Sequence, residues 1–183
     1  MNPTEQRLKT LTDNLNQLYK KLGFFERELM KAVGAEAKYG ITQQIEEDII
    51  PYIRKYEQEY WQIFPINAII ISEEEATTEL TQVQQAIDKI QYSNSNGENY
   101  PQKLLDILEE IQTKLNDSEK AAAAKLKVVL PLIPMIASYE LEIDTENFIY
   151  KTLESIRGLL KKDRKSTRLN SSHEWISRMP SSA

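Results

Sequence analysis

Apolar residues along this chain recur at spacings of three and four, the period expected of amphipathic helices. The most regular run lies in the first thirty residues and forms a strict seam sustained for about three heptads. Its members are Leu8, Leu11, Leu15, Leu18, Leu22, Phe25 and Leu29. A seam of this kind predicts a coiled coil, whose apolar stripe needs a partner from the same chain or from another chain.

A second helix is predicted from about Ile41 to Phe64, and we expect it to pair with the first as a hairpin. Pro51 lies inside this pattern. Because proline lacks an amide hydrogen and clashes with the carbonyl one turn earlier, we expect a kink, or a split after Ile50. One face carries aromatic residues at four-residue spacing, which favours packing over the alternative of nucleotide stacking. These residues are Tyr52, Tyr56 and Tyr60.

Two more helices follow an apolar segment, INAIII, which we interpret as a packing staple rather than a strand. Ser72 with Glu75 predicts a capping box, so the acidic run here is interpreted as capping rather than as a metal or acid–base site. The third helix ends at the predicted linker SNSNGENY. The seams of the third and fourth helices are Ala76, Leu80, Val83, Ile87 and Ile90, and Leu104, Leu108, Ile111 and Leu115.

The most apolar stretch runs from Lys125 to Leu160. Asp117 or Ser118 is expected to cap a fifth helix that enters it. Pro131 and Pro134 should bend or end that helix. A sixth helix is expected to be capped by Asp144 and Thr145, with Phe148, Ile149, Leu153, Ile156 and Leu160 on one face.

The predicted fold is therefore all-α, an arrangement of antiparallel helical hairpins or a bundle with coiled-coil character and about six helices. We divide the chain into a coiled hairpin (1–64), a helical bundle with the proline-broken segment (65–162) and a disordered tail (163–183). The tail resembles the in-frame translation of a sequencing-library adapter, in the strings DRKSTRLNSSH and ISRMPSSA. We expect it to be foreign sequence that contributes nothing to the fold.

Composition narrows the function. The chain has 183 residues, no cysteine and one histidine, so disulfides, thiolate metal sites and the usual zinc sets are not expected. A net charge of −5 argues against a protein that binds nucleic acid by neutralising phosphates. With no signal peptide pattern and no long apolar run, we expect a cytoplasmic protein.

Motifs for phosphate cradles, dinucleotide turns, nucleophile elbows and zinc-protease helices are all missing from the sequence. We therefore expect a protein that is not an enzyme and that has no catalytic residues, cofactor, metal or small-molecule substrate.

Two parts of the chain resemble a known group. The strings ISEEEATTELTQVQQAIDKIQ, YPQKLLDILEEIQTKLND and AAAAKLKVVLPLIPMIASYELEIDTE, with the N-terminal LNQLYKKLGFFERELMKAVG, are similar to helical effector-associated adaptor regions of bacterial conflict-system proteins. Such regions lie beside NACHT-type STAND NTPases and caspase-like or CHAT proteases. The resemblance implies coupling of a sensor to an effector by like-with-like contacts. No NTPase or protease module is present, so it implies no enzymatic activity.

These observations predict a protein–protein interaction module whose partner is a second copy or a different protein. The candidate interaction residues are the seam from Leu8 to Leu29 and the apolar segment residues Leu130, Leu132, Ile133 and Met135. The alternative is a membrane-acting effector that inserts the apolar segment 128–137 at a bilayer surface.

Overall fold

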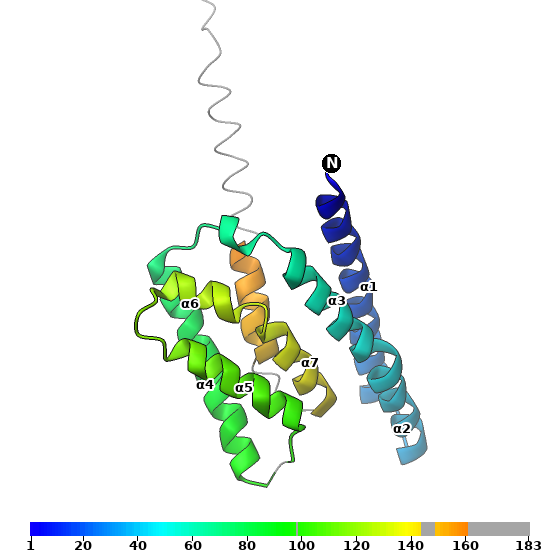
Figure 1. Cartoon of the computed structure of the whole chain (residues 1–183). Coiled ribbons are helices and arrows are strands. Elements are labelled where there is room, and N and C mark those ends of the chain that lie inside the picture. Colours follow the sequence, from blue (N-terminus) through cyan, green and yellow to red (C-terminus); the bar gives the residue numbers. More distant parts are fainter. Residues whose placement is uncertain (98, 144–148, 161–183) are drawn as a thin grey trace, which may run out of the picture.

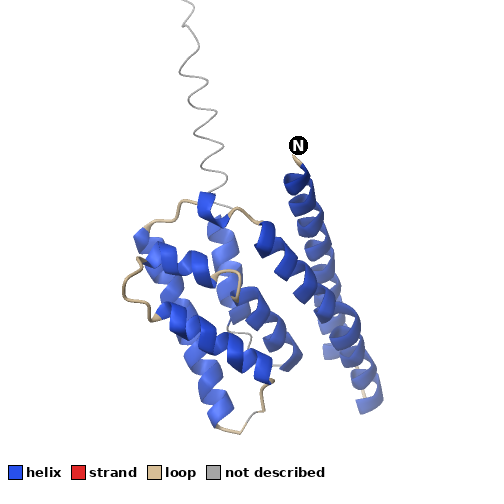
Figure 2. Ribbon diagram, viewed as in Figure 1, coloured by secondary structure: helices blue, strands red, loops and turns tan. Residues whose placement is uncertain are grey.

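The structure is a computed structural model, and it describes residues 1–97, 99–143 and 149–160. Within these ranges every regular element is helical and no strand occurs, so the all-α prediction is confirmed (Figure 2). The α-helices are α1 (Pro3–Lys31), α2 (Ala35–Gln44), α3 (Ile50–Ile63), α4 (Glu73–Ser95), α5 (Gln102–Leu115), α6 (Ala122–Val129) and α7 (Ile133–Ile143). A π-helical segment (Ile45–Ile49) precedes α3, a short 3-10 helix (Ile66–Ala68) follows it, and residues 149–160 are also helical.

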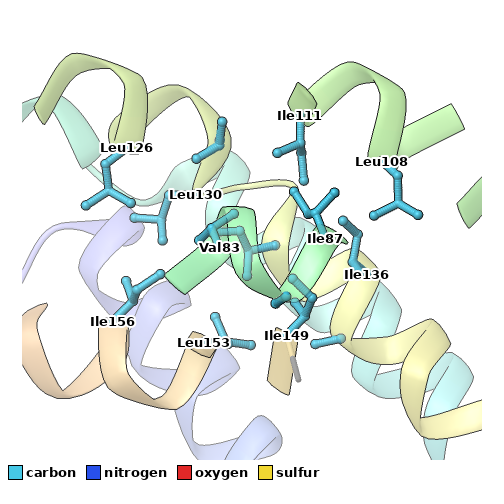
Figure 3. Close-up of a cluster of buried hydrophobic side chains, with 14 of the residues drawn as sticks. Val83, Ile87, Leu108, Ile111, Leu126, Leu130, Ile136, Ile149, Leu153 and Ile156 are labelled. Atoms are coloured by element: carbon cyan, nitrogen blue, oxygen red, sulfur yellow. The ribbon is translucent and has the colours of Figure 1, made fainter. Parts of the chain in front are cut away.

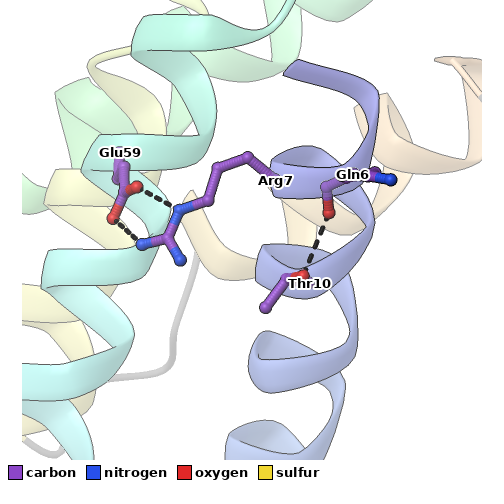
Figure 4. A network of polar contacts seen from close by, with 4 residues as sticks. All are labelled: Gln6, Arg7, Thr10 and Glu59. Atoms are coloured by element: carbon purple, nitrogen blue, oxygen red, sulfur yellow. Dashed lines mark hydrogen bonds and ion pairs between the residues drawn. The ribbon is translucent and has the colours of Figure 1, made fainter. Parts of the chain in front are cut away.

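The predicted N-terminal hairpin is formed by α1 and α3, which lie side by side and run in opposite directions (Figure 1). A capping box begins α1: the Asn2 side chain accepts a hydrogen bond from the amide of Glu5, and the Glu5 carboxylate accepts one from the amide of Asn2. Arg7 of α1 donates two hydrogen bonds to Glu59 of α3, at 2.5 and 2.7 Å (Figure 4). This bidentate pair fixes the register of the two helices near the beginning of α1 and the end of α3.

The leucine seam of α1 has its partner within the chain. Leu11 is fully buried, and two further seam residues belong to a small hydrophobic core shared with the π-helical segment and α3. That core consists of Leu15, Leu22, Ile45, Ile49, Ile50 and Ile53. The partner of this seam is therefore supplied by the same chain and not by another one.

Pro51 interrupts the second predicted helix, as expected. The amide of Ile50 donates to the carbonyl of Ile45, five residues earlier, and the proline then occupies the first turn of α3. A proline is tolerated there because the first amides of a helix have no partner within it. The wider π-helical turn accommodates the proline, so the second arm of the hairpin remains helical on both sides of Pro51.

The larger hydrophobic core lies among α4, α5, α6, α7 and residues 149–160 (Figure 3). Each of these elements points apolar side chains inward. Those labelled in Figure 3 are Val83, Ile87, Leu108, Ile111, Leu126, Leu130, Ile136, Ile149, Leu153 and Ile156. Trp61 and Phe64 at the end of α3 belong to the same core, so the hairpin and the bundle are joined by shared packing.

The predicted capping box of Ser72 and Glu75 is confirmed at the start of α4. α4 then continues to Ser95, past the predicted beginning of the linker, because the turn is made only at Gly97, whose φ is +102°. Gln84 of α4 and Gln112 of α5 exchange hydrogen bonds of 3.1 and 3.3 Å. The third and fourth predicted helices therefore meet, although α4 packs more extensively against α6.

The predicted start of the fifth helix is wrong. Neither Asp117 nor Ser118 caps α6, whose N-cap is Ala121. The Asp117 carboxylate instead accepts from the amide of Glu119, two residues on, which closes a local turn. A carboxylate from another helix supplies the missing cap, since Glu73 accepts hydrogen bonds from the amides of Ala122 and Ala123 at 2.9 and 3.2 Å.

Pro131 lies in the break between α6 and α7, Pro134 lies in the first turn of α7, and the two helices are bent by 50°. Val129, Leu130 and Ile136 on either side of the bend are fully buried. The stretch is thus a buried bend. The predicted caps at Asp144 and Thr145, and the predicted tail at 163–183, lie outside the described residues.

Candidate functional site

The structure places the predicted interaction residues largely inside the protein. Leu11, Leu15, Leu22, Leu130 and Ile133 are buried. The others are half-buried: Leu8, Leu18, Phe25, Leu29, Leu132 and Met135. These side chains pack within the chain, so a role for them in binding a partner stays a prediction.

The segment 128–137 of the membrane alternative has the same location. Among the described helices, no single one is long and apolar enough to cross a membrane, whereas α6 and α7 together meet that criterion by length and composition as a bent pair. Their apolar side chains lie in the larger core. Insertion into a bilayer would therefore require the bundle to open, which weakens this alternative.

Exposed apolar side chains gather instead at the end of the hairpin, where α1 turns into α2. We call residues 24–44 the hairpin tip. Within the described part of the chain, eight large apolar residues are more than half exposed, and four of them lie here. They are Phe24 (51%), Met30 (79%), Val33 (92%) and Tyr39 (70%). Gly34, with a φ of +95°, makes the turn, and α2 buries none of its own residues.

Charges of both signs surround the hairpin tip. The end of α1 and the body of α2 carry three exposed basic residues as well as the exposed acidic residues Glu26 and Glu36, and the adjoining π-helical segment carries three further exposed acidic residues in succession. The basic residues are Arg27, Lys31 and Lys38, and the acidic residues of the π-helical segment are Glu46, Glu47 and Asp48. A surface of this kind can complement a copy of itself, because each sign finds the opposite sign on the other chain.

A cavity of about 530 Å³ lies between α1, α3 and residues 149–160. Five of its thirteen lining residues are aromatic, and five others are polar or charged. The lining residues are Thr12, Leu15, Asn16, Tyr19, Glu57, Tyr60, Trp61, Phe64, Tyr150, Glu154, Arg157, Gly158 and Leu160.

Glu57 in this cavity is 1% exposed and is held by three side chains. Tyr19 donates a hydrogen bond to one carboxylate oxygen at 2.8 Å, and Trp61 donates to the other at 3.0 Å. Arg157 forms an ion pair with the same carboxylate, and its guanidinium lies 5.2 Å from the centre of the Tyr19 ring. The cluster compensates a buried charge and ties α1, α3 and the last described helix together.

Tyr19 of this cluster and the neighbouring Tyr150 both have raised pKa values. Burial raises the pKa of Tyr19. Burial, reinforced by the negative charge of Glu154, raises the pKa of Tyr150 to about 12. Both phenols are therefore neutral near pH 7 and can act as hydrogen-bond donors.

The predicted aromatic face of α3 is divided between packing and exposure. Tyr60 stacks on Phe64 at 5.2 Å, and Tyr56 packs on the smaller core. Tyr52 is 51% exposed. In the described part of the chain no group of three or more metal-binding side chains comes together.

Sequence reasoning missed the Glu57 cluster. Its members are separated by 38 residues between Tyr19 and Glu57 and by a further 100 residues to Arg157. One local signal was available, since Glu57 and Trp61 are four residues apart on one face of α3. Comparison of the chain with family models, curated proteins and solved structures finds no match.

Proposed function

We propose that this chain is a non-enzymatic protein–protein interaction module, an adaptor that couples a sensor to an effector in a bacterial defence system, and that it acts in the cytoplasm. The exposed apolar hairpin tip is the observation that supports this function best. Scattered exposed apolar residues are ordinary, whereas their concentration at one projecting end is typical of a contact surface. The sequence resemblance described above supports the biological setting.

A second copy of the chain is the partner that the hairpin tip fits best. The tip carries exposed basic residues next to exposed acidic ones, so a two-fold arrangement pairs each sign with its opposite. The apolar residues Met30 and Val33 lie among the basic residues in the sequence and are 79% and 92% exposed in the single chain. Like-with-like pairing through the tip leaves the larger core intact as the scaffold that presents it.

Sedimentation velocity of the whole chain tests the proposal. We expect a concentration-dependent dimer that the double substitution Met30→Asp/Val33→Asp abolishes, since a buried charge without a partner is costly at an interface. Ile70→Asp is the matched control, because Ile70 is 82% exposed and lies outside the tip. Dimers that survive the tip substitutions, or a chain that stays monomeric at every concentration, would contradict homotypic pairing.

Charge reversal sharpens the same test. Lys31→Glu alone and Glu47→Lys alone should each weaken self-association, because each places like charges opposite one another. An equimolar mixture of the two variants should then form a heterodimer. If the mixture associates no better than either variant, the contact does not use these charges.

A further inference from the structure

The cavity between α1, α3 and residues 149–160 has the properties of a small-molecule site. Its volume of about 530 Å³ falls within the usual range for such sites. Five aromatic side chains line it, from three elements that are distant in the sequence. Polar and charged side chains line it as well, and the cluster around Glu57 holds Tyr19 and Arg157 in place. Preorganised polar groups in an aromatic wall are what a binding site needs.

Gly158 lines the cavity and is itself exposed to solvent, so it offers a position from which the cavity can be filled. It lies inside the last described helix, where glycine is less favourable than alanine. A Cβ added at Gly158 would meet no atom within 4 Å, so neither packing nor backbone geometry requires glycine there. Because Gly158 lines the cavity, a larger side chain at this position would occupy it.

The charged residues that line the cavity indicate which charge a ligand should carry. Its ionisable groups other than tyrosine are two carboxylates, Glu57 and Glu154, and one guanidinium, Arg157. The guanidinium is engaged by Glu57 and by the ring of Tyr19. The remaining negative charge is that of Glu154, which is exposed and adjoins the aromatic wall. A carboxylate beside aromatic faces favours a cation, since the π face of an aromatic ring attracts positive charge.

From these observations we propose that this cavity binds a small organic cation with an apolar body, such as an aryl- or alkylammonium compound. The apolar body packs against the aromatic wall, and the ammonium group lies near Glu154. This binding is separate from pairing through the hairpin tip, which lies outside the cavity lining. It departs from the sequence analysis, in which no small-molecule substrate was expected.

Fluorescence of Trp61 reports on the cavity directly, because Trp61 is part of its wall. The whole chain with Trp175→Phe retains Trp61 as its single tryptophan. Titration with benzyltrimethylammonium should give a saturable change in emission. Benzyl alcohol and phenylacetate share the ring but lack the positive charge. Their affinities should be lower by about tenfold or more. No saturable change, or equal binding of phenylacetate, would overturn the proposal.

Substitutions in the same background locate the binding. Gly158→Phe should abolish binding by filling the cavity, whereas Gly158→Ala should preserve it. Glu154→Gln should weaken benzyltrimethylammonium several-fold without changing the affinity for benzyl alcohol. Circular dichroism checks that each variant is folded. If Gly158→Phe unfolds, Asn16→Phe fills the same cavity from α1 and decides the question. A folded filling variant that binds like its parent would overturn the proposal.

Discussion

The bundle and the hairpin tip are built from the same kind of helix and differ in what covers it. α4 buries six residues, five of them in the larger core, whereas α2 buries none. The seams of α4, α5 and α1 are largely covered within the chain, while Met30, Val33 and Tyr39 at the tip are 70% or more exposed. Most stability should therefore reside in the bundle, and most capacity for contact should reside in the tip.

The largest expected difference between the two regions concerns truncation of apolar side chains. Ile87→Ala in the bundle should lower the free energy of unfolding by about 2–5 kcal/mol, because it leaves a cavity in the fully buried core. Met30→Ala at the tip should change it by less than about 0.5 kcal/mol. Urea denaturation of both variants measures the contrast. Similar losses at both positions would mean that the tip is part of the stable core.

The next effect concerns the cluster that joins the hairpin to the bundle. Arg157→Leu should cost about 3 kcal/mol, because Glu57 would remain buried without its compensating charge. Arg7→Leu is the matched control, since it removes an arginine from a more exposed pair with Glu59. Urea denaturation should show a clearly smaller loss for the control. Equal losses would contradict the importance assigned to the buried charge.

A smaller loss of stability is expected where the beginning of α4 contacts the beginning of α6. Glu73→Ala removes the hydrogen bonds to the first amides of α6 and should cost about 1 kcal/mol. Glu74→Ala is the control in the same helical turn, and Glu74 is exposed. Thermal unfolding compares the two. If Glu74→Ala is as costly, the loss belongs to the dipole of α4 and not to the cap of α6.

The smallest effect depends on pH. Glu79 is 8% exposed and accepts a hydrogen bond from Ser155 at 3.1 Å, and burial raises its pKa above the ordinary 4.5. The folded chain therefore binds this proton more tightly than the unfolded chain, so stability falls as pH rises from about 4.5 through the raised pKa. Glu79→Gln should be more stable than the parent near pH 7, and the difference should vanish below pH 4.5.

The free energies of unfolding of the parent and of Glu79→Gln, compared between pH 4 and pH 7, measure this effect. A difference of the same size at every pH would show that the charge of Glu79 is not responsible.

The parts of the fold that depend on neighbouring residues were predictable from the sequence. The seam of α1, the capping box at Ser72 and the breaks at Pro51 and Pro131 follow from local spacing and from proline chemistry, and the structure confirms them. The start of α6 was mispredicted because its cap comes from Glu73, which is 49 residues earlier in the sequence.

The candidate sites were harder to predict for the same physical reason. Periodicity identifies an apolar face but does not say what covers it, so the seam and the apolar segment were expected to bind a partner, yet they pack within the chain. The cavity and the Glu57 cluster depend on contacts between α1, α3 and the last described helix. Such contacts leave no spacing rule in the sequence.

Hydrogen exchange of the whole chain at low and high protein concentration tests most directly whether the hairpin tip is the contact surface. We expect the amides of α2 to exchange rapidly in dilute solution and to become protected as concentration rises, while those of α4 and α6 stay unchanged. Exchange in α2 that is independent of concentration, or new protection confined to residues 128–137, would contradict pairing through the tip.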